Sequence, residues 1–462
     1  MNTTSLLASD NTIPTNANCK DHANYLDVQC FINSQPLSRY QWRIMLLCFL
    51  IVFLDGLDTA AMGFIIPALS QEWGIDRASL GPVMSAALVG MIFGALGSGP
   101  LADRFGRKHV LVLATFMFGA FSVAAAFSTS FNQLVAWRLL AGLGLGAAMP
   151  NATTLLSEYT PQRLRSLLVT SMFCGFNLGM ASGGLFSAWL IPAYGWHSLL
   201  LVGGLLPLAL TVVLWLALPE SASYLAVQNK STELIRKVLL PIGDAVRTAK
   251  GFCVAQSAGD KGHGMLRLVM SGRYRAGTLL LWFSNFMGLM IIYLLTSWLP
   301  TLMRDSGSSV EQSAVIGALF QLGGVFSAVG VGWAIDRYNP HKVIGAFYLM
   351  AGGFVWLVGQ SIQQLPMLAT LVLVAGMCVN GAQSAMPSLA ARFYPTQGRA
   401  TGVSWMLGIG RFGGVTGAWA GATLLGAGWG FEQVLTALVV PATLATIAIL
   451  IKGLVSHSDV TE

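Results

Sequence analysis

Two aspartates in the middle of an apolar run are the side chains most able to do chemistry. Asp55 and Asp58 lie in the hydrophobic stretch 42–69, within the string Phe-Leu-Asp-Gly-Leu-Asp-Thr-Ala. A stretch of this length suits a membrane-spanning helix, which puts both carboxylates near mid-bilayer. A charge at that depth costs at least ~2.5–3.5 kcal/mol, so an intramembrane acid is a functional hypothesis by default.

The two acids are three residues apart and therefore share one face of the helix. That face must look into protein or a water-filled cavity. Two carboxylates this close in a low dielectric favour a protonated form of at least one of them, which is what a proton carrier needs. We interpret Asp55 and Asp58 as proton-coupling groups. The structural alternative is that each acid only satisfies backbone groups or a nearby arginine.

The composition requires a membrane to position these acids. Of 462 residues, 55% are hydrophobic and 10% are charged, whereas a soluble domain carries about 25% charged residues. The first ~38 residues are polar and lack the basic start and short apolar core of a signal peptide, so we expect a cytosolic tail. Six cysteines are present, and none pairs with another at metal-ligand spacing; we expect thiols and no metal or other cofactor.

Apolar runs of spanning length recur twelve times and predict an all-α membrane protein with two six-helix units. The predicted domains are a tail (1–38), an N-terminal six-helix bundle (39–218), a central cytosolic loop (219–274), a C-terminal six-helix bundle (275–455) and a short tail (456–462). The runs are 42–69, 79–102, 109–128, 132–156, 165–190, 197–218, 275–303, 312–334, 342–362, 366–390, 400–424 and 431–452.

The charge distribution orients the chain. With the N-terminus inside, most of the 26 Lys and Arg residues fall in the tail, the central loop and the other cytosolic connections. This bias predicts both termini in the cytosol by the positive-inside rule. It also accounts for the net charge of +7 without a nucleic-acid partner.

The halves repeat each other. Ile66-Pro-Ala-Leu matches Leu299-Pro-Thr-Leu at an offset of 233, and Gly99-Pro-Leu-Ala-Asp-Arg matches Gly332-Trp-Ala-Ile-Asp-Arg at the same offset. A third match, around Glu158 and Arg392, has an offset of 234. A duplicated six-helix unit is typical of transporters that bind substrate between their halves at the bilayer midplane.

The string Gly99-Pro-Leu-Ala-Asp-Arg-Phe-Gly-Arg-Lys resembles the signature between helices 2 and 3 of the major facilitator superfamily. Its position, its side and its degenerate second copy all agree with that family. Arg138, followed by Gly142 and Gly146, resembles the helix-4 motif. The run from Asp55 to Pro67 is similar to helix 1 of the aromatic acid:proton symporter branch. The resemblance implies a substrate such as 4-hydroxybenzoate, protocatechuate or vanillate.

An arginine at mid-membrane is the candidate for binding a carboxylate. Arg411 lies near the middle of run 400–424, and the repeat places Asn177 opposite it. A guanidinium grips a carboxylate through two parallel hydrogen bonds, although a static ion pair with Asp55 or Asp58 is the alternative. Beside these two residues, Phe176 and Phe412 are the aromatics best placed to stack on an aromatic substrate.

Charged residues at the predicted cytosolic helix ends suit a network that holds an inner gate closed, or else only signal topology. Arg138 and Glu158 are assigned to coupling or to a structural bridge. The gating candidates are Asp103, Arg104, Arg107, Asp336, Arg337, Arg165, Arg392 and Arg399.

The sequence thus predicts a proton-coupled importer of an aromatic carboxylate in a bacterial inner membrane, acting as a monomer, and not an enzyme. Three alternatives stay open: a symporter of a non-aromatic organic acid, a proton-driven efflux pump, and a transporter with an added sensory role. Efflux antiporters of the superfamily carry a Gly-Pro dipeptide on helix 5, and the corresponding segment from Gly175 lacks that proline.

Overall fold

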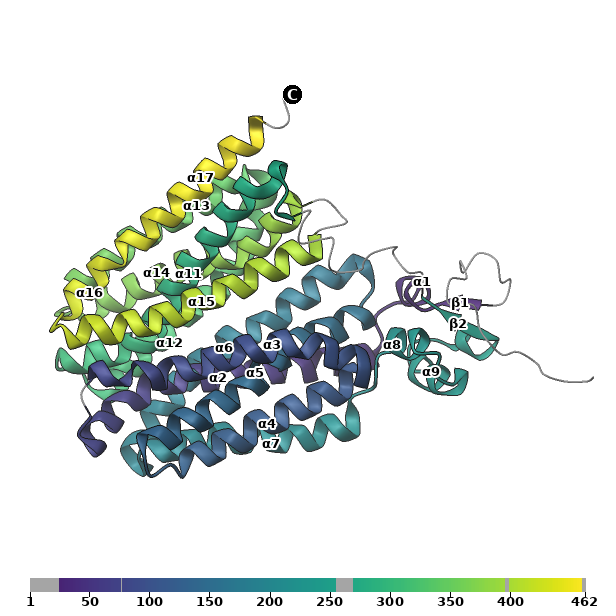
Figure 1. Ribbon diagram of the computed structural model, residues 1–462, viewed down its shortest axis with the longest axis horizontal. Coiled ribbons are helices and arrows are strands. Elements are labelled where there is room, and N and C mark those ends of the chain that lie inside the picture. Colours follow the sequence, from purple (N-terminus) through teal and green to yellow (C-terminus); the bar gives the residue numbers. More distant parts are fainter. Residues whose placement is uncertain (1–24, 76, 255–268, 395–398, 459–462) are drawn as a thin grey trace, which may run out of the picture.

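The computed structural model describes residues 25–75, 77–254, 269–394 and 399–458. The N-terminal half is a bundle of six long helices, drawn in purple to teal in Figure 1. They are α2 (Arg39–Trp73), α3 (Gly81–Phe105), α4 (Arg107–Ala126), α5 (Phe131–Tyr159), α6 (Gln162–Tyr194) and α7 (Trp196–Ala217), with the short η2 (Arg77–Leu80) before α3.

The C-terminal half repeats the arrangement. Its last span is interrupted at Leu438 because Pro441 cannot donate to the carbonyl four residues earlier. The helices are α11 (Gly272–Asp305), α12 (Val310–Arg337), α13 (Pro340–Gln360), α14 (Leu365–Phe393), α15 (Arg399–Gly426), α16 (Phe431–Ala437) and α17 (Val439–Ser458).

The predicted spans agree with the observed helices. Eleven helical segments of the described chain are long and apolar enough to cross a membrane, and the 28-residue α15 supplies the twelfth by length and packing. Local signals set several boundaries. Ser38 and Gln41 form a capping box at the start of α2, and Ser309 and Gln312 form another at the start of α12.

The region expected as a loop contains short elements that the hydropathy pattern does not reveal. They are α8 (Ala222–Val227), α9 (Thr232–Leu239), η3 (Asp244–Arg247) and β2 (Gly251–Cys253). The tail contributes β1 (Tyr25–Asp27) and α1 (Val28–Ser34), and β1 pairs with β2 in parallel. The tail also contacts the N-terminal bundle, because Gln162 N, at the start of α6, donates to Asn33 Oδ1 at 2.8 Å.

The cysteines depart from expectation at one position. Cys30, Cys48, Cys174 and Cys378 are free, whereas Cys253 is disulfide-bonded. Cys19 lies outside the described residues. No group of three or more His, Cys, Asp or Glu side chains within the described ranges could hold a metal ion.

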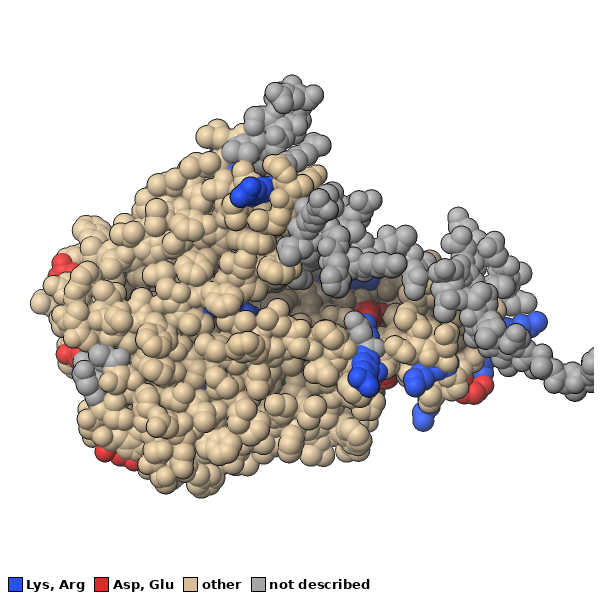
Figure 2. Space-filling model, viewed as in Figure 1, with Lys and Arg blue, Asp and Glu red and all other residues tan. Residues whose placement is uncertain are grey.

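The two halves meet at one end of the molecule and separate at the other. We name the end that carries α1 and the last turns of α17 the termini end, and the opposite end the far end (Figure 1). At the far end, Trp419 Nε1 donates to Ser85 Oγ at 2.6 Å across the interface. Figure 2 shows the surface hollowed between the halves toward the termini end, with charged atoms at the mouth of the hollow.

Small residues allow the close contact at the far end. A methyl group on Gly63 would lie 2.5 Å from the carbonyl oxygen of Thr296 in the other half. A void of only about 10 Å³ remains between α2, α6, α11 and α12, next to Phe64 and Gln321. The far end is therefore closed, and the protein is in a state open toward the termini end.

Candidate functional site

Asp58 is held in a buried ion pair. Both terminal nitrogens of Arg138, on α5, donate to its two carboxylate oxygens at 2.8 Å each. Ser122 Oγ, on α4, donates to the same carboxylate at 3.2 Å. Asp58 and Arg138 are each only 1% exposed. The pair therefore joins α2, α4 and α5 in the interior of the N-terminal half, and such geometry gives the strongest kind of charge-assisted hydrogen bond.

Asp55 has a different environment, although it lies one turn earlier on the same helix. Its side chain is 1% exposed, and its Oδ2 atom is buried without a hydrogen-bond partner. Thr59 Oγ1 donates to its Oδ1 at 3.5 Å, which is a long contact. Asp55 interacts electrostatically with Arg411 and with Asp58. It is thus a buried carboxyl group with spare capacity to take up a proton.

Close packing of α2 against α6 fixes the depth of these acids. A methyl group on Gly56, between the two acids, would lie 2.1 Å from the carbonyl oxygen of Phe176. Only a residue without a side chain permits this approach. The aromatic ring of Phe176 is partly buried against the cluster that includes Ala60 and Phe64.

Arg411 reaches across the interface between the halves. Its Nη1 donates to the carbonyl oxygen of Met91, on α3, at 3.1 Å. Tyr293, on α11, interacts electrostatically with both Arg411 and Asp55. Its ring packs closely on Gly414, because a methyl group on Gly414 would lie 2.7 Å from Cδ2 of the ring. The guanidinium thus interacts with Asp55 but does not form the direct ion pair with Asp58; Arg138 does.

Asn177 occupies the matching place in the other half. Its Nδ2 would lie 3.2 Å from a methyl group on Gly324, on α12, where the Asn380 side chain also approaches. Gly324 corresponds to Met91 at the repeat offset of 233, as Arg411 corresponds to Asn177 at 234. The structure therefore places Arg411 and Asn177 at pseudo-symmetric crossing points of the two halves.

The structure does not bring Phe412 to the same place. Its side chain is 52% exposed and shares a stripe of α15 with the exposed Trp405, whereas Gly410 and Gly413 pack on α11. One residue along a helix turns the side chain by about 100°. Phe412 therefore points away from the direction in which Arg411 approaches α3.

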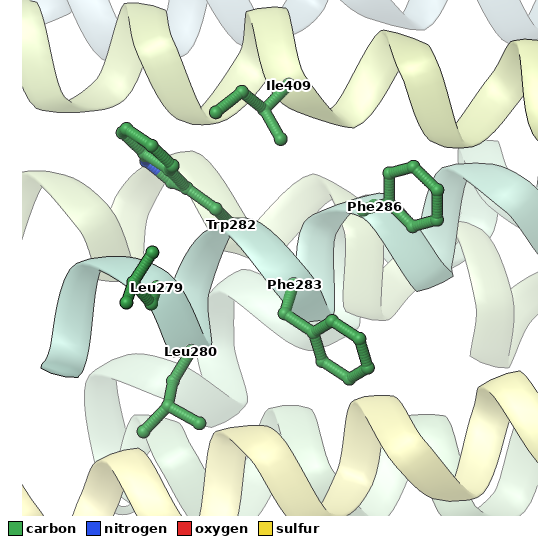
Figure 3. Close-up of a pocket in the computed structure, with 6 residues that line it drawn as sticks. All are labelled: Leu279, Leu280, Trp282, Phe283, Phe286 and Ile409. Atoms are coloured by element: carbon green, nitrogen blue, oxygen red, sulfur yellow. The ribbon is translucent and has the colours of Figure 1, made fainter.

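An apolar groove lies on α11 and α15 and is separate from these charges (Figure 3). Its volume is about 480 Å³, and it is lined by Leu279, Leu280, Trp282, Phe283, Phe286 and Ile409. The ring of Trp282 stacks on that of Trp405 with centroids 6.0 Å apart. The lining offers no charged group to a carboxylate, so the groove is not the candidate site.

The contacts described for the charged residues near the termini end each lie within one half of the protein. Arg107 Nε lies 3.6 Å from Glu158 Oε1, and Arg107 also lies over the ring of Tyr224. Arg104 lies over Phe105, and Arg337 lies over Trp333 in the second half.

The remaining gating candidates are placed only in part. Arg165 is half-buried at the start of α6, with its Nε atom buried and without a hydrogen-bond partner, and Arg392 is exposed near the end of α14. The side chains of Asp103, Asp336 and Arg399 lie outside the described part of the chain.

Sequence reasoning did not identify Ser122 or Glu220, and it noted Tyr293 only as one of several aromatic residues within the spans. Ser122 and Tyr293 have no distinctive local motif, and only the packing of α4 and α11 brings them to the acids. Glu220 follows α7 and accepts from Lys108 N at 3.1 Å, which caps the start of α4. Glu220 lies shortly after a helix and directly before Ser221, and this position is the sequence feature that could have identified it.

The Major Facilitator Superfamily model matches residues 48–256 and 281–459 of this chain. The chain is 74% identical over 435 residues to the 4-hydroxybenzoate transporter PcaK of Pseudomonas aeruginosa, covering 94% of this chain and 97% of that protein. It is 49% identical over 428 residues to the gallate transporter of Pseudomonas putida, covering 93% of this chain and 95% of that relative.

Solved structures agree on the fold. A crystal structure of a D-xylose-proton symporter superposes with a TM-score of 0.69 at 16% identity, covering 89% of this chain and 97% of that one. A partially occluded inward-open form of the xylose transporter XylE from E. coli also gives 0.69, at 18% identity and with the same coverage. The chain therefore belongs to the Major Facilitator Superfamily, and within it to the aromatic acid transporters.

Proposed function

We propose that this protein imports an aromatic carboxylate together with protons by alternating access, and that Asp55 is the residue that binds the coupled proton. The relatives' names supply the substrate class: 4-hydroxybenzoate in one and gallate in another. The observation that carries the coupling step is the contrast between the two acids. Asp58 is bound by Arg138 at both oxygens, and Asp55 has one buried oxygen without a partner.

A proton has different consequences at the two acids. On Asp58 it would break two charge-assisted hydrogen bonds and leave Arg138 as a buried, unpaired cation, which is costly. On Asp55 it would neutralise a buried charge whose one hydrogen bond within the described residues is the long one from Thr59. Proton binding and release at Asp55 therefore disturb the structure least, and Asp58 serves as the fixed member of the pair.

The substrate carboxylate is assigned to Arg411. Its guanidinium makes one hydrogen bond, to the carbonyl oxygen of Met91, so donors remain for a bound anion. Because Arg411 interacts electrostatically with Asp55, protonation of Asp55 would free positive charge for that anion. One proton on Asp55 thus compensates the negative charge of one bound substrate carboxylate. Asn177, on α6, approaches Gly324 of the C-terminal half and supplies a neutral donor.

The cycle uses the repeat. Substrate and proton enter when the far end is open, the halves rock about the central contacts, and both leave through the hollow at the termini end. The basic residues of the central loop and of the other connections at the termini end support an orientation in which that end faces the cytosol of a bacterium, across its inner membrane. We propose that the monomer is the working unit, because the site lies between the two halves of a single chain.

The test is uptake of labelled 4-hydroxybenzoate into vesicles that contain the purified protein. An inward proton gradient is expected to drive accumulation above equilibrium, and an uncoupler is expected to abolish it. Asp55→Asn is expected to lose accumulation but to retain exchange of labelled for unlabelled substrate, because exchange needs no net proton release. Thr59→Ala is the matched control and should retain accumulation.

Two of the alternatives predict a different result in this assay. Export from loaded vesicles driven by protons would indicate an efflux pump, and competition by an aliphatic acid alone would indicate a non-aromatic substrate. Accumulation by Asp55→Asn at the level of the parent protein would remove Asp55 from the proposal.

A further inference from the structure

A chain of neutral hydrogen bonds crosses the C-terminal half. Tyr348 OH donates to Gln383 Oε1 at 3.0 Å, and Gln383 Nε2 donates to Asn285 Oδ1 at 2.7 Å. Asn285 Nδ2 in turn donates to the carbonyl oxygen of Met406 at 2.9 Å. The chain joins α13, α14, α11 and α15. A backbone carbonyl can only accept, so its last link fixes the orientation of both amides.

This chain involves the equivalent helices of its unit, as the ion pair does in the N-terminal half, but not equivalent residues, since the offset of 233 takes Ser122 to Val355 and Arg138 to Leu371. In each half, one member of the network lies on the third helix of the unit and another lies on the fourth helix. These members are Ser122 and Arg138 in the N-terminal half, and Tyr348 and Gln383 in the C-terminal half. The repeat offset of 233 pairs Asp55 with Gly288. A methyl group on Gly288 would lie 2.3 Å from both Gln383 Oε1 and Tyr348 OH. Polar atoms of the neutral chain therefore occupy the space that a side chain at the position equivalent to Asp55 would take.

Of the three side chains in the neutral chain, Gln383 is the one that is not fully buried. Asn285 and Tyr348 are each 0% exposed, whereas Gln383 is half-buried and the adjacent Ser384 is exposed. Asn380 lies one turn earlier on the same side of α14 and approaches Gly324 together with Asn177 of the other half. Gln383 is one turn nearer the termini end, where the halves separate into the hollow (Figure 2).

The bonding capacity of this amide is half used. A glutamine amide has two N–H donors and an oxygen with two lone pairs. The neutral chain uses one donor and one lone pair of Gln383, so one N–H and one lone pair remain. A phenolic hydroxyl is both a donor and an acceptor, and an amide held rigidly by two buried neighbours can satisfy both functions.

We propose that Gln383 recognises a hydroxyl group on the ring of the transported acid and so selects hydroxylated over unsubstituted benzoates. The inference rests on the proposed function, because it takes the carboxylate to be held at Arg411, on the neighbouring helix α15. The two ends of the substrate then meet different chemistry, a cation at one and a neutral amide at the other. Tyr348 and Asn285 act as positioning residues, since they hold the amide without reaching the hollow.

The experiment compares uptake of 4-hydroxybenzoate and benzoate by Gln383→Met, which keeps the length of the side chain and removes its hydrogen bonds. A site built to bind a hydroxyl discriminates strongly against an analogue that lacks it, so the wild-type ratio of kcat/KM should favour 4-hydroxybenzoate. The variant should lower this ratio roughly 10-fold or more, with benzoate uptake changed by less than about 2-fold. Ser384→Ala, on the same helix, is the control and should keep the wild-type ratio.

Tyr348→Phe tests the positioning role without touching the hollow. It removes the hydrogen bond to Gln383 Oε1, so the ratio should fall by an intermediate amount, through KM for 4-hydroxybenzoate more than through kcat. It also keeps the inference testable if Gln383→Met fails to reach the membrane. An unchanged ratio in both variants, equal losses for both acids, or a wild type that treats the two acids alike would overturn the inference. Absence of uptake of either acid by the wild type would instead refute the proposed function.

Discussion

Arg138 and Asp58 are joined by two parallel hydrogen bonds of 2.8 Å, and each side chain is 1% exposed. Asp55, three residues earlier on the same helix, has a buried oxygen without a partner. The two acids therefore differ in what a proton would do to them, although the sequence presents them alike. This contrast separates a fixed structural pair from a group that can change charge during transport.

Removing one member of the pair should destabilise the protein. Arg138→Gln leaves the Asp58 charge buried and unpaired, and loss of one partner from such a pair costs about 3–5 kcal/mol. Combining it with Asp58→Asn removes both charges, so the double variant should regain much of the lost stability while transport remains impaired. Unfolding temperature in detergent and abundance in the membrane measure this. A double variant less stable than either single variant would contradict the pairing.

Arg411→Lys should impair uptake nearly as much as Arg411→Ala. Lysine keeps the positive charge but loses the planar fork that binds a carboxylate through two bonds. The expected sign is a large rise in KM, measured by the concentration dependence of uptake at equal protein level. Lys108→Arg, at the start of α4 and half-buried there, is a control for basic exchange outside the site. Wild-type affinity in Arg411→Lys would reduce the role of Arg411 to that of a point charge.

Gly56→Ala should disturb the packing that positions both acids. The added methyl would lie 2.1 Å from the carbonyl oxygen of Phe176, and overpacking of this kind costs typically about 1–3 kcal/mol. Gly97→Ala is the matched control, since a methyl group there would meet no atom within 4 Å. Thermal stability and initial uptake rate should fall for Gly56→Ala and stay near wild type for Gly97→Ala. Equal behaviour of the two variants would show that α2 and α6 can separate without loss.

Locking the far end should arrest the cycle. A methyl group on Gly81 would lie 3.3 Å from Cβ of Ala422 in the other half, which is close to the spacing of a disulfide. Gly81→Cys with Ala422→Cys should therefore crosslink under oxidation and hold the state that is open toward the termini end. Uptake should stop and return after reduction, and substrate binding from the open side should persist. Full uptake by the oxidised, crosslinked protein would mean that the far end does not open during transport.

The sequence by itself determined the architecture. Hydropathy placed twelve spans, and charge bias and the repeat offset of 233 predicted two related bundles, because apolar length and periodic duplication leave direct traces in the chain. The intramembrane positions of Asp55, Asp58, Arg138 and Arg411 were equally visible, since an ionisable residue stands out in an apolar run.

Only the tertiary structure decided which charges meet. Arg138 is 80 residues from Asp58, and Arg411 is 320 residues from Met91, so their pairing depends on helix rotation and tilt, which the spacing along one helix does not encode. The same limit applied to the neutral chain through Gln383 and to the strand pairing of Tyr25–Asp27 with Gly251–Cys253. A single glutamine or tyrosine in an apolar helix carries no distinctive sequence signal. Its role becomes visible only when packing brings its polar atoms within hydrogen-bond distance of a partner.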